Sequence, residues 1–220
     1  TGRLIVPDIS ELNDDTYSEK PVEFSAYLQD KIEYKNVIIN AGLRFDYFNS
    51  NGDLLADPAD PNIFDPFKVA NDNLTFEERQ QAWYTPAKSK SRISPRFGIA
   101  YPITDRGVIQ FSYGHFLQVP SFRYLYNQPG FKVNKVTPLQ GVYGNADLEP
   151  QKTVMYELGL QQQLTDLIGI DITGFYRDVR DWISTGVPVP TAIAGISYVS
   201  YTNRDYANVR GLTLALNSRH

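Results

Sequence analysis

Aromatic rings and a guanidinium gather in one short stretch of the chain, Ser121-Phe122-Arg123-Tyr124-Leu125-Tyr126. Rings beside a guanidinium can stack on flat or sugar-like ligands and hydrogen-bond to their edges. Trp83-Tyr84 offers a second, smaller group of rings. The alternative is that these rings pack inside their loops or belong to the interfacial girdle of a membrane protein. The candidate ligand-binding residues are therefore Trp83, Tyr84, Phe122, Arg123, Tyr124 and Tyr126.

Catalytic chemistry has little support in the sequence. The chain has two histidines, His115 and His220, and they do not form a pair with metal-ligand spacing. It contains no Gly-x-Ser-x-Gly nucleophile elbow and no phosphate-cradling loop. We therefore expect no enzyme activity, no catalytic residue and no cofactor.

Four aspartates of the segment 50–92 could supply oxygen ligands to a calcium ion: Asp53, Asp57, Asp60 and Asp65. Their spacing does not fit the EF-hand loop. Proline follows three of them, and Asp-Pro is ordinary turn chemistry. We therefore expect no metal site in this segment.

The segments that would position these loops carry a different pattern. From Val37 to Phe48, apolar side chains alternate with mostly polar or small ones. Period-2 alternation of this length predicts a β-strand long enough to cross a bilayer at a tilt. A similar strand over 24–34 and the tight turn Lys35-Asn36 precede it, so the two form a hairpin. The same alternation recurs over residues 93–101, 109–114, 153–164, 168–177 and 197–218.

Long and short connections alternate between these seven strands. The long ones cover about 50–92, 120–150 and 186–196, and the others are tight turns. Transmembrane barrels alternate in this way between outer loops and periplasmic turns, so the expected fold is all-β, an antiparallel up-and-down transmembrane β-barrel. Because bacterial single-chain barrels have an even number of strands, seven predict a partial barrel. A further strand within 1–9 or 199–206 would change that count.

Two other architectures compete with the partial barrel. A soluble all-β ligand- or carbohydrate-binding module would have strands nearer five or six residues and a second sheet covering the apolar faces. A smaller closed barrel, acting as an adhesin or enzyme, would need an even strand number. Strands of about ten residues or more favour the third possibility, a segment of a larger transmembrane barrel.

Composition excludes several other classes. The 220 residues contain no run of about 18 apolar residues, which excludes a transmembrane helix. The absence of cysteine excludes a disulfide framework and a thiolate metal site. The net charge is -4 and no basic stripe is present, so nucleic acid is not an expected partner.

Charged residues recur on the polar phase of the strands. Because side chains alternate between the two faces of a strand, these charges should face an aqueous lumen and pair with neighbouring strands. The residues concerned are Lys31, Arg44, Arg96, Glu157 and Arg177.

Several motifs resemble those of one membrane-protein family. Residues 145–152, Asn-Ala-Asp-Leu-Glu-Pro-Gln-Lys, followed by Tyr156-Glu157-Leu158-Gly159, resemble the "NPDLKPE…YELG" stretch of TonB-dependent outer-membrane receptors. Residues 94–98 and 111–114, with Phe116 and Pro120 after them, are similar to the family's "SPR.G…YG..F..P" hairpin.

Two further stretches extend this resemblance. Residues 41–46 are similar to the family's "GLRYD" strand, and Arg210-Gly211-Leu212 resembles its "GxE" strand, with Thr213 where the family usually has Glu. In order and spacing, the matches cover most of residues 23–218. The ordered set identifies residues 1–220 as one segment of a TonB-dependent receptor β-barrel.

The resemblance implies a function and a location. Such receptors are 22-stranded barrels in the outer membrane of Gram-negative bacteria that import scarce nutrients. The implied partners are outer-membrane lipid, the remaining strands and plug domain of the same receptor, TonB contacted through an N-terminal part, and a small nutrient of unknown identity. The outer loops would capture this ligand.

Overall fold

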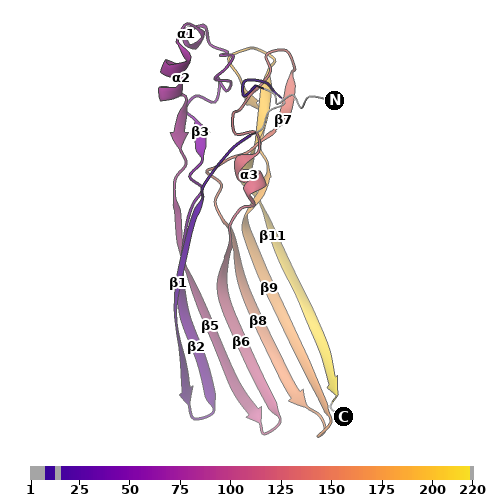
Figure 1. Ribbon diagram of the computed structural model, residues 1–220. Helices are drawn as coiled ribbons and strands as arrows, with labels where there is room; N and C mark the ends of the chain where they lie inside the picture. The colour runs from indigo at the N-terminus through magenta and orange to yellow at the C-terminus, as the bar shows by residue number, and fades with distance from the viewer. Residues whose placement is uncertain (1–7, 13–15, 219–220) are drawn as a thin grey trace, which may run out of the picture.

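The computed structural model describes residues 8–12 and 16–218, and consists of one large sheet with a layer of loops at one end (Figure 1). The long strands lie in the order β1-β2-β5-β6-β8-β9-β11, and each is antiparallel to its neighbours. The predicted antiparallel, up-and-down partial barrel is therefore confirmed. The seven long strands are β1 (Val22–Tyr34), β2 (Val37–Asn49), β5 (Lys90–Thr104), β6 (Gly107–Gln118), β8 (Gln151–Gln163), β9 (Ile168–Thr185) and β11 (Ser197–Ser218).

Tight turns join the strands at one end of the sheet, and the long connections lie at the other (Figure 1). Residues 199–206 belong to β11 and add no separate strand, whereas residues 1–7 lie outside the described part of the chain. Among the described residues, no helix is long and apolar enough to cross a membrane.

The loop layer contains short elements that the alternation did not predict. Strands β3 and β4 form a small two-stranded antiparallel sheet, and β7 pairs in parallel with the start of β11. Helix α2 begins with a capping box, in which Thr75 and Glu78 each bond the other's backbone N–H. The elements are β3 (Asp53–Leu55), α1 (Val69–Asp72), α2 (Phe76–Ala82), β4 (Tyr84–Pro86), α3 (Phe122–Tyr126), β7 (Leu139–Tyr143) and β10 (Val189–Pro190).

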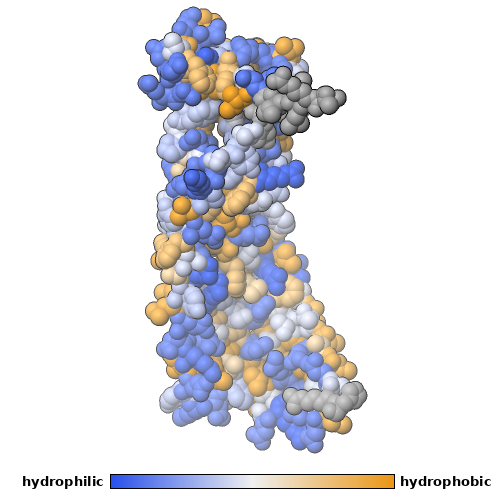
Figure 2. All heavy atoms as spheres, viewed as in Figure 1, coloured by the Kyte–Doolittle hydropathy of each residue, from blue (hydrophilic) through white to orange (hydrophobic). Residues whose placement is uncertain are grey.

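Pairing registers assign the strand residues to two faces, because directly opposite residues share a face. One row joins Phe111, Leu158, Gly174 and Leu212 on β6, β8, β9 and β11. Leucines on this apolar face are exposed and no second sheet covers them: Leu158 is 56% exposed and Leu214 is 66% exposed. Figure 2 shows hydrophobic side chains along the flanks of the lower sheet, beneath a mainly hydrophilic loop layer.

The apolar face has the height expected of a membrane-crossing strand. On β9 its apolar side chains run from Ile168 to Tyr176, and Asp178 and Arg180 follow on the same face. A tilted strand needs about 9–11 residues to cross a bilayer. At the upper limit of this band the rings of Tyr113, Tyr156 and Tyr176 form a row, with centroids 5.1 and 6.3 Å apart. Such a row is typical of an interfacial girdle.

The opposite, polar face carries Lys31, Arg44, Arg96, Glu157 and Arg177, as predicted. Arg44 Nε lies 2.8 Å from Asp46 Oδ1 on the same strand. Glu157 accepts a hydrogen bond from Ser112 Oγ at 3.2 Å, and Arg177 Nη2 lies 3.9 Å from its carboxylate. These ion pairs balance charge locally along the wall, whereas Arg96 lies over the Phe116 ring.

Pro95 coincides with an opening in the sheet. The pairing of β2 with β5 continues past Pro95 to Lys90, but the pairing of β5 with β6 stops at Arg96. Strand β6 continues to Gln118, paired with β8 alone. The sequence predicts either a strand end or an irregularity at this proline, and the structure shows the irregularity, since proline has no N–H to donate.

Candidate ligand-binding site

The loop layer has two hydrophobic cores of its own. The first packs residues from all three long connections, and the second joins the tops of the strands to α3. The buried members of the first are Phe67, Phe131, Val133, Tyr143, Ile196 and Tyr198. Those of the second are Phe48, Leu125, Tyr126 and Leu148. Long loops with this packing present a pre-formed surface.

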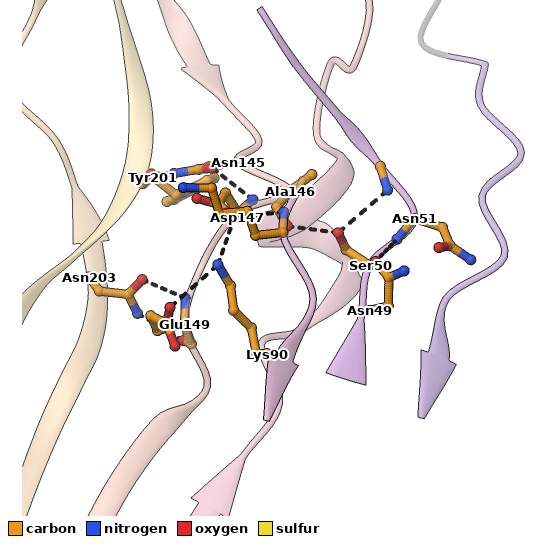
Figure 3. A network of polar contacts seen from close by, with 12 residues as sticks. Asn49, Ser50, Asn51, Lys90, Asn145, Ala146, Asp147, Glu149, Tyr201 and Asn203 are labelled. Carbon is orange, nitrogen blue, oxygen red and sulfur yellow. Dashed lines mark hydrogen bonds and ion pairs between the residues drawn. The ribbon is translucent and has the colours of Figure 1, made fainter. Parts of the chain in front are cut away.

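Residues 145–149, which we call the strap, connect this layer to the sheet (Figure 3). Ser50 Oγ, just after β2, donates to the carbonyl of Ala146 at 2.8 Å. Lys90 Nζ on β5 lies 2.6 Å from Asp147 Oδ1 and 3.3 Å from Glu149 Oε1. The strap therefore holds β5 in the region where β5 lacks backbone pairing with β6.

The other end of the strap contacts β11 (Figure 3). Asn203 Oδ1 accepts from the Glu149 N–H at 2.8 Å, and Asn203 Nδ2 donates to the Glu149 carbonyl at 2.9 Å. Asn145 Nδ2 donates to the Tyr201 carbonyl at 2.9 Å. Segments far apart in the sheet order are therefore joined through side chains, and the motif that carried the family resemblance supplies the link.

Two of the predicted ligand-binding residues are buried in the loop layer. Trp83 is 7% exposed and its Nε1 donates to the Pro61 carbonyl at 3.2 Å. Tyr126 is 3% exposed and its hydroxyl donates to the Ser50 carbonyl. Both rings therefore have structural contacts, although Tyr126 also borders the cleft described below.

The stretch 121–126 contains α3, which begins at Phe122. The rings of Phe122 and Tyr126 lie together, with centroids 5.9 Å apart. Phe122 and Arg123 are exposed, whereas Tyr124 packs edge-on against Tyr201, with ring centroids 4.8 Å apart. A stacked array of all four candidate residues does not form. Ligand binding by Phe122 and Arg123 stays a prediction.

Three of the four aspartates of the first long loop have polar partners in the loop layer. Asp60 is buried and accepts hydrogen bonds from the Phe67 N–H at 2.6 Å and from Asn71 Nδ2 at 2.8 Å. Asp57 pairs with Lys68, and Asp65 pairs with Lys135. In the described part of the chain, no group of three or more His, Cys, Asp or Glu could hold a metal ion.

His115 lies on β6 and has a side-chain hydrogen-bond partner. Its Nε2 lies 2.6 Å from the Tyr113 hydroxyl. His220 lies outside the described residues.

A cleft of about 250 Å³ opens in the loop layer between the segment before β1, β3–β4 and α3. The rings of Tyr17 and Tyr126 on its wall have centroids 5.7 Å apart. Further lining residues are Glu19, Asp53, Tyr84 and Phe131. The cleft therefore includes two predicted residues, Tyr84 and Tyr126.

The two carboxylates determine the electrostatics of this cleft. Burial and then the nearby Asp53 raise the pKa of Glu19. Burial and Asp53 raise the pKa of Tyr84 to about 12, and burial, Glu19 and Tyr17 raise that of Tyr126 to about 12. Both phenols therefore stay neutral near pH 7, and a cation in the cleft would relieve the repulsion between the acids.

Sequence reasoning missed Tyr17 and Glu19 and considered Asp53 only as a calcium ligand. The cleft draws on segments separated by more than 30 residues, from 16–19, 52–53, 84 and 125–131. The spacing of residues along the sequence does not predict such a site.

Comparisons with known proteins agree on one family. The profile described as "TonB dependent receptor-like, beta-barrel" matches residues 5–219. No curated protein sequence matches the chain.

Solved structures show the same fold at low identity. The Serratia marcescens hemophore receptor HasR is 18% identical over 92% of this chain and 32% of its own, with a TM-score of 0.60. The Pseudomonas aeruginosa ferric enterobactin receptor PfeA is 18% identical over 87% of this chain and 24% of its own, with a TM-score of 0.58. The Neisseria meningitidis iron transporter FrpB is 13% identical over 93% of this chain and 25% of its own, with a TM-score of 0.56. The chain spans a third or less of these proteins.

Proposed function

Because the chain belongs to the TonB-dependent receptor β-barrel family, we propose that it forms part of the wall of an outer-membrane receptor for a scarce nutrient. Its seven long strands correspond to about a third of a 22-stranded outer-membrane transporter. The remaining strands and a plug domain would complete the receptor, and TonB would energise uptake. The family is one of receptors and transporters, and we propose no catalytic role.

The observation that carries this proposal is the difference between the two faces of one sheet. Leu43, Leu158 and Leu214 lie exposed on the apolar face, whereas the opposite face carries paired charges. A water-soluble protein rarely exposes a continuous apolar surface of this kind. Lipid on one side and an aqueous lumen on the other would satisfy both faces.

The sidedness can be tested with single cysteines, because the chain has none of its own. A fluorophore attached to Leu214→Cys should be quenched by nitroxide-labelled lipids when the full receptor is folded in vesicles. The same fluorophore on Thr213→Cys, on the opposite face, should be quenched much less. Equal quenching at the two positions would contradict the lipid-facing assignment.

Uptake requires a second experiment in cells. Deleting the gene should impair growth when the cargo is limiting, and disrupting TonB should reproduce the defect. The solved relatives are described as proteins for heme, ferric enterobactin and iron. These are the first cargoes to assay, but they differ from one another, so the shared wall does not select among them. Growth that is independent of both TonB and this gene on every cargo would refute the uptake function.

A further inference from the structure

The cleft beside Tyr17 differs from the rest of the loop layer in its charge. Among the described residues that line it, Glu19 and Asp53 are the charged side chains, and both are acids. Several acids elsewhere in the layer are paired with bases, as in Asp57–Lys68 and Asp65–Lys135. The cleft therefore concentrates negative potential.

Four aromatic side chains also line the cleft. Tyr17 and Tyr126 are inclined at 38° to each other, and Tyr84 and Phe131 also line the space. The faces of aromatic rings are electron-rich and attract cations, most effectively where water is partly excluded. Rings and carboxylates thus favour the same kind of ligand.

Contacts within the protein fix the position of the Tyr126 side chain. Its hydroxyl is occupied by the Ser50 carbonyl, and its ring packs in the second hydrophobic core. At Gly52, beside this ring, an added Cβ would lie 2.8 Å from the Ala146 Cβ and 3.0 Å from the Tyr126 ring. The floor of the cleft is therefore close-packed. Ligand binding would cost little side-chain entropy there, because the side chains are already ordered.

We propose that this cleft binds a small organic cation, an alkylammonium or trimethylammonium group, with Glu19 and Asp53 balancing its charge and the exposed Tyr17 ring, supported from behind by Tyr126, contacting its methyl or methylene groups. A hard metal ion fits less well, because calcium takes about six to eight oxygen ligands. At about 250 Å³ the cleft admits a small molecule or one cationic arm of a larger cargo. The inference rests on the proposed function, in which these loops face the medium and capture the nutrient.

Choline and its neutral carbon isostere, 3,3-dimethylbutan-1-ol, are the probes that test this proposal. Their binding would be measured by titration calorimetry on the full receptor in detergent. Choline should bind, and the isostere should bind about tenfold more weakly or not at all, because the two differ in charge and hardly in shape.

Variants then assign the binding to the cleft. The double substitution Glu19→Gln/Asp53→Asn should weaken choline binding about tenfold or more, since it removes both charges and keeps the side-chain shapes. Tyr17→Leu should weaken choline binding while leaving the carboxylates in place. Glu77→Gln, an acid on α2 outside the cleft, is the matched control and should leave binding unchanged.

Several outcomes would overturn the proposal: equal affinity for the two probes, no choline binding, or choline binding that the double substitution does not change. Calcium binding lost in the double variant, without choline binding, would also overturn it. The growth assay separates this failure from a failure of the proposed function. A receptor that supports TonB-dependent growth but binds no choline contradicts the ligand class alone.

Discussion

The lower sheet and the loop layer are stabilised in different ways. In the lower sheet, β8, β9 and β11 pair through long backbone ladders, and leucines such as Leu158 and Leu214 remain exposed. The loop layer holds both buried hydrophobic clusters and the side-chain network of the strap. The loops bury their own apolar groups from water, whereas the sheet leaves its apolar face exposed, to be covered by lipid in the proposed receptor.

The largest expected effect is on the lipid-facing side of the lower sheet. Leu214→Arg should destabilise the receptor by about 2–4 kcal/mol in vesicles, because a guanidinium would enter hydrocarbon. Thr213→Arg, next to it on the polar face, should cost about 1 kcal/mol or less. Urea unfolding in lipid vesicles measures both, and equal costs would remove the distinction between the faces.

Close packing in the loop layer should give the next largest effect. A Cβ at Gly144 would lie 2.6 Å from both the Asn127 nitrogen and the Leu125 carbonyl oxygen, so the backbone would have to move. Gly144→Ala should cost about 2–3 kcal/mol, seen as faster hydrogen exchange in residues 122–148. Gly174→Ala is the control, because no atom lies within 4 Å of the added Cβ there. Matching exchange rates in the two variants would show that this loop is not tightly packed.

The strap predicts a somewhat smaller effect. Asn203→Ala removes the two bonds to Glu149 and a third to the Asp181 carbonyl at 2.8 Å. Half-buried partners would lose their hydrogen bonds, at a cost of about 1–2 kcal/mol, and protease cleavage of residues 144–150 should accelerate. Asn217→Ala breaks one exposed contact with Asp171 in the lower sheet and should leave the cleavage rate unchanged. Unaltered cleavage in the Asn203 variant would mean that the strap is held by other contacts.

The smallest effect is expected at the turns of the lower sheet. Arg106 and Asp166 form an ion pair at 3.0 Å, but both side chains are largely exposed. Arg106→Ala should change the free energy of unfolding by about 0.5 kcal/mol or less, because water and salt screen such pairs. The vesicle unfolding assay applies again. A loss above about 1 kcal/mol would indicate that the turns, and not the ladders, hold the lower sheet together.

The same contrast explains what could be predicted from the sequence. All seven long strands and their faces follow from period-2 alternation, which is a local property of segments such as 37–48. Ladder pairing can extend beyond the alternating residues, so β5 begins at Lys90 and β9 continues to Thr185. Strand phase also predicted pairing of the charges with neighbouring strands. Arg177 and Glu157 pair in this way, whereas Arg44 pairs with Asp46 on its own strand.

The loop layer was less predictable because its elements depend on contacts between distant segments. The capping box at Thr75 and Glu78 is a local signal for α2, and the strand alternation does not contain it. The parallel pairing of β7 with β11 and the meeting of Tyr17 with Tyr126 have no local signature. Residue types pointed correctly to rings in the loops, but could not distinguish the buried Trp83 from the exposed Phe122.

Pro95 has a consequence for how this region can change in evolution. Since β5 and β6 stop pairing at Arg96, the upper part of β5 pairs with β2 and the upper part of β6 pairs with β8. Insertions or deletions in residues 50–89 or 119–150 can therefore be accommodated in the loops, without shifting the strand pairing below Arg96. One proline thus allows the loop layer to change in length and sequence while the sheet keeps its strand register.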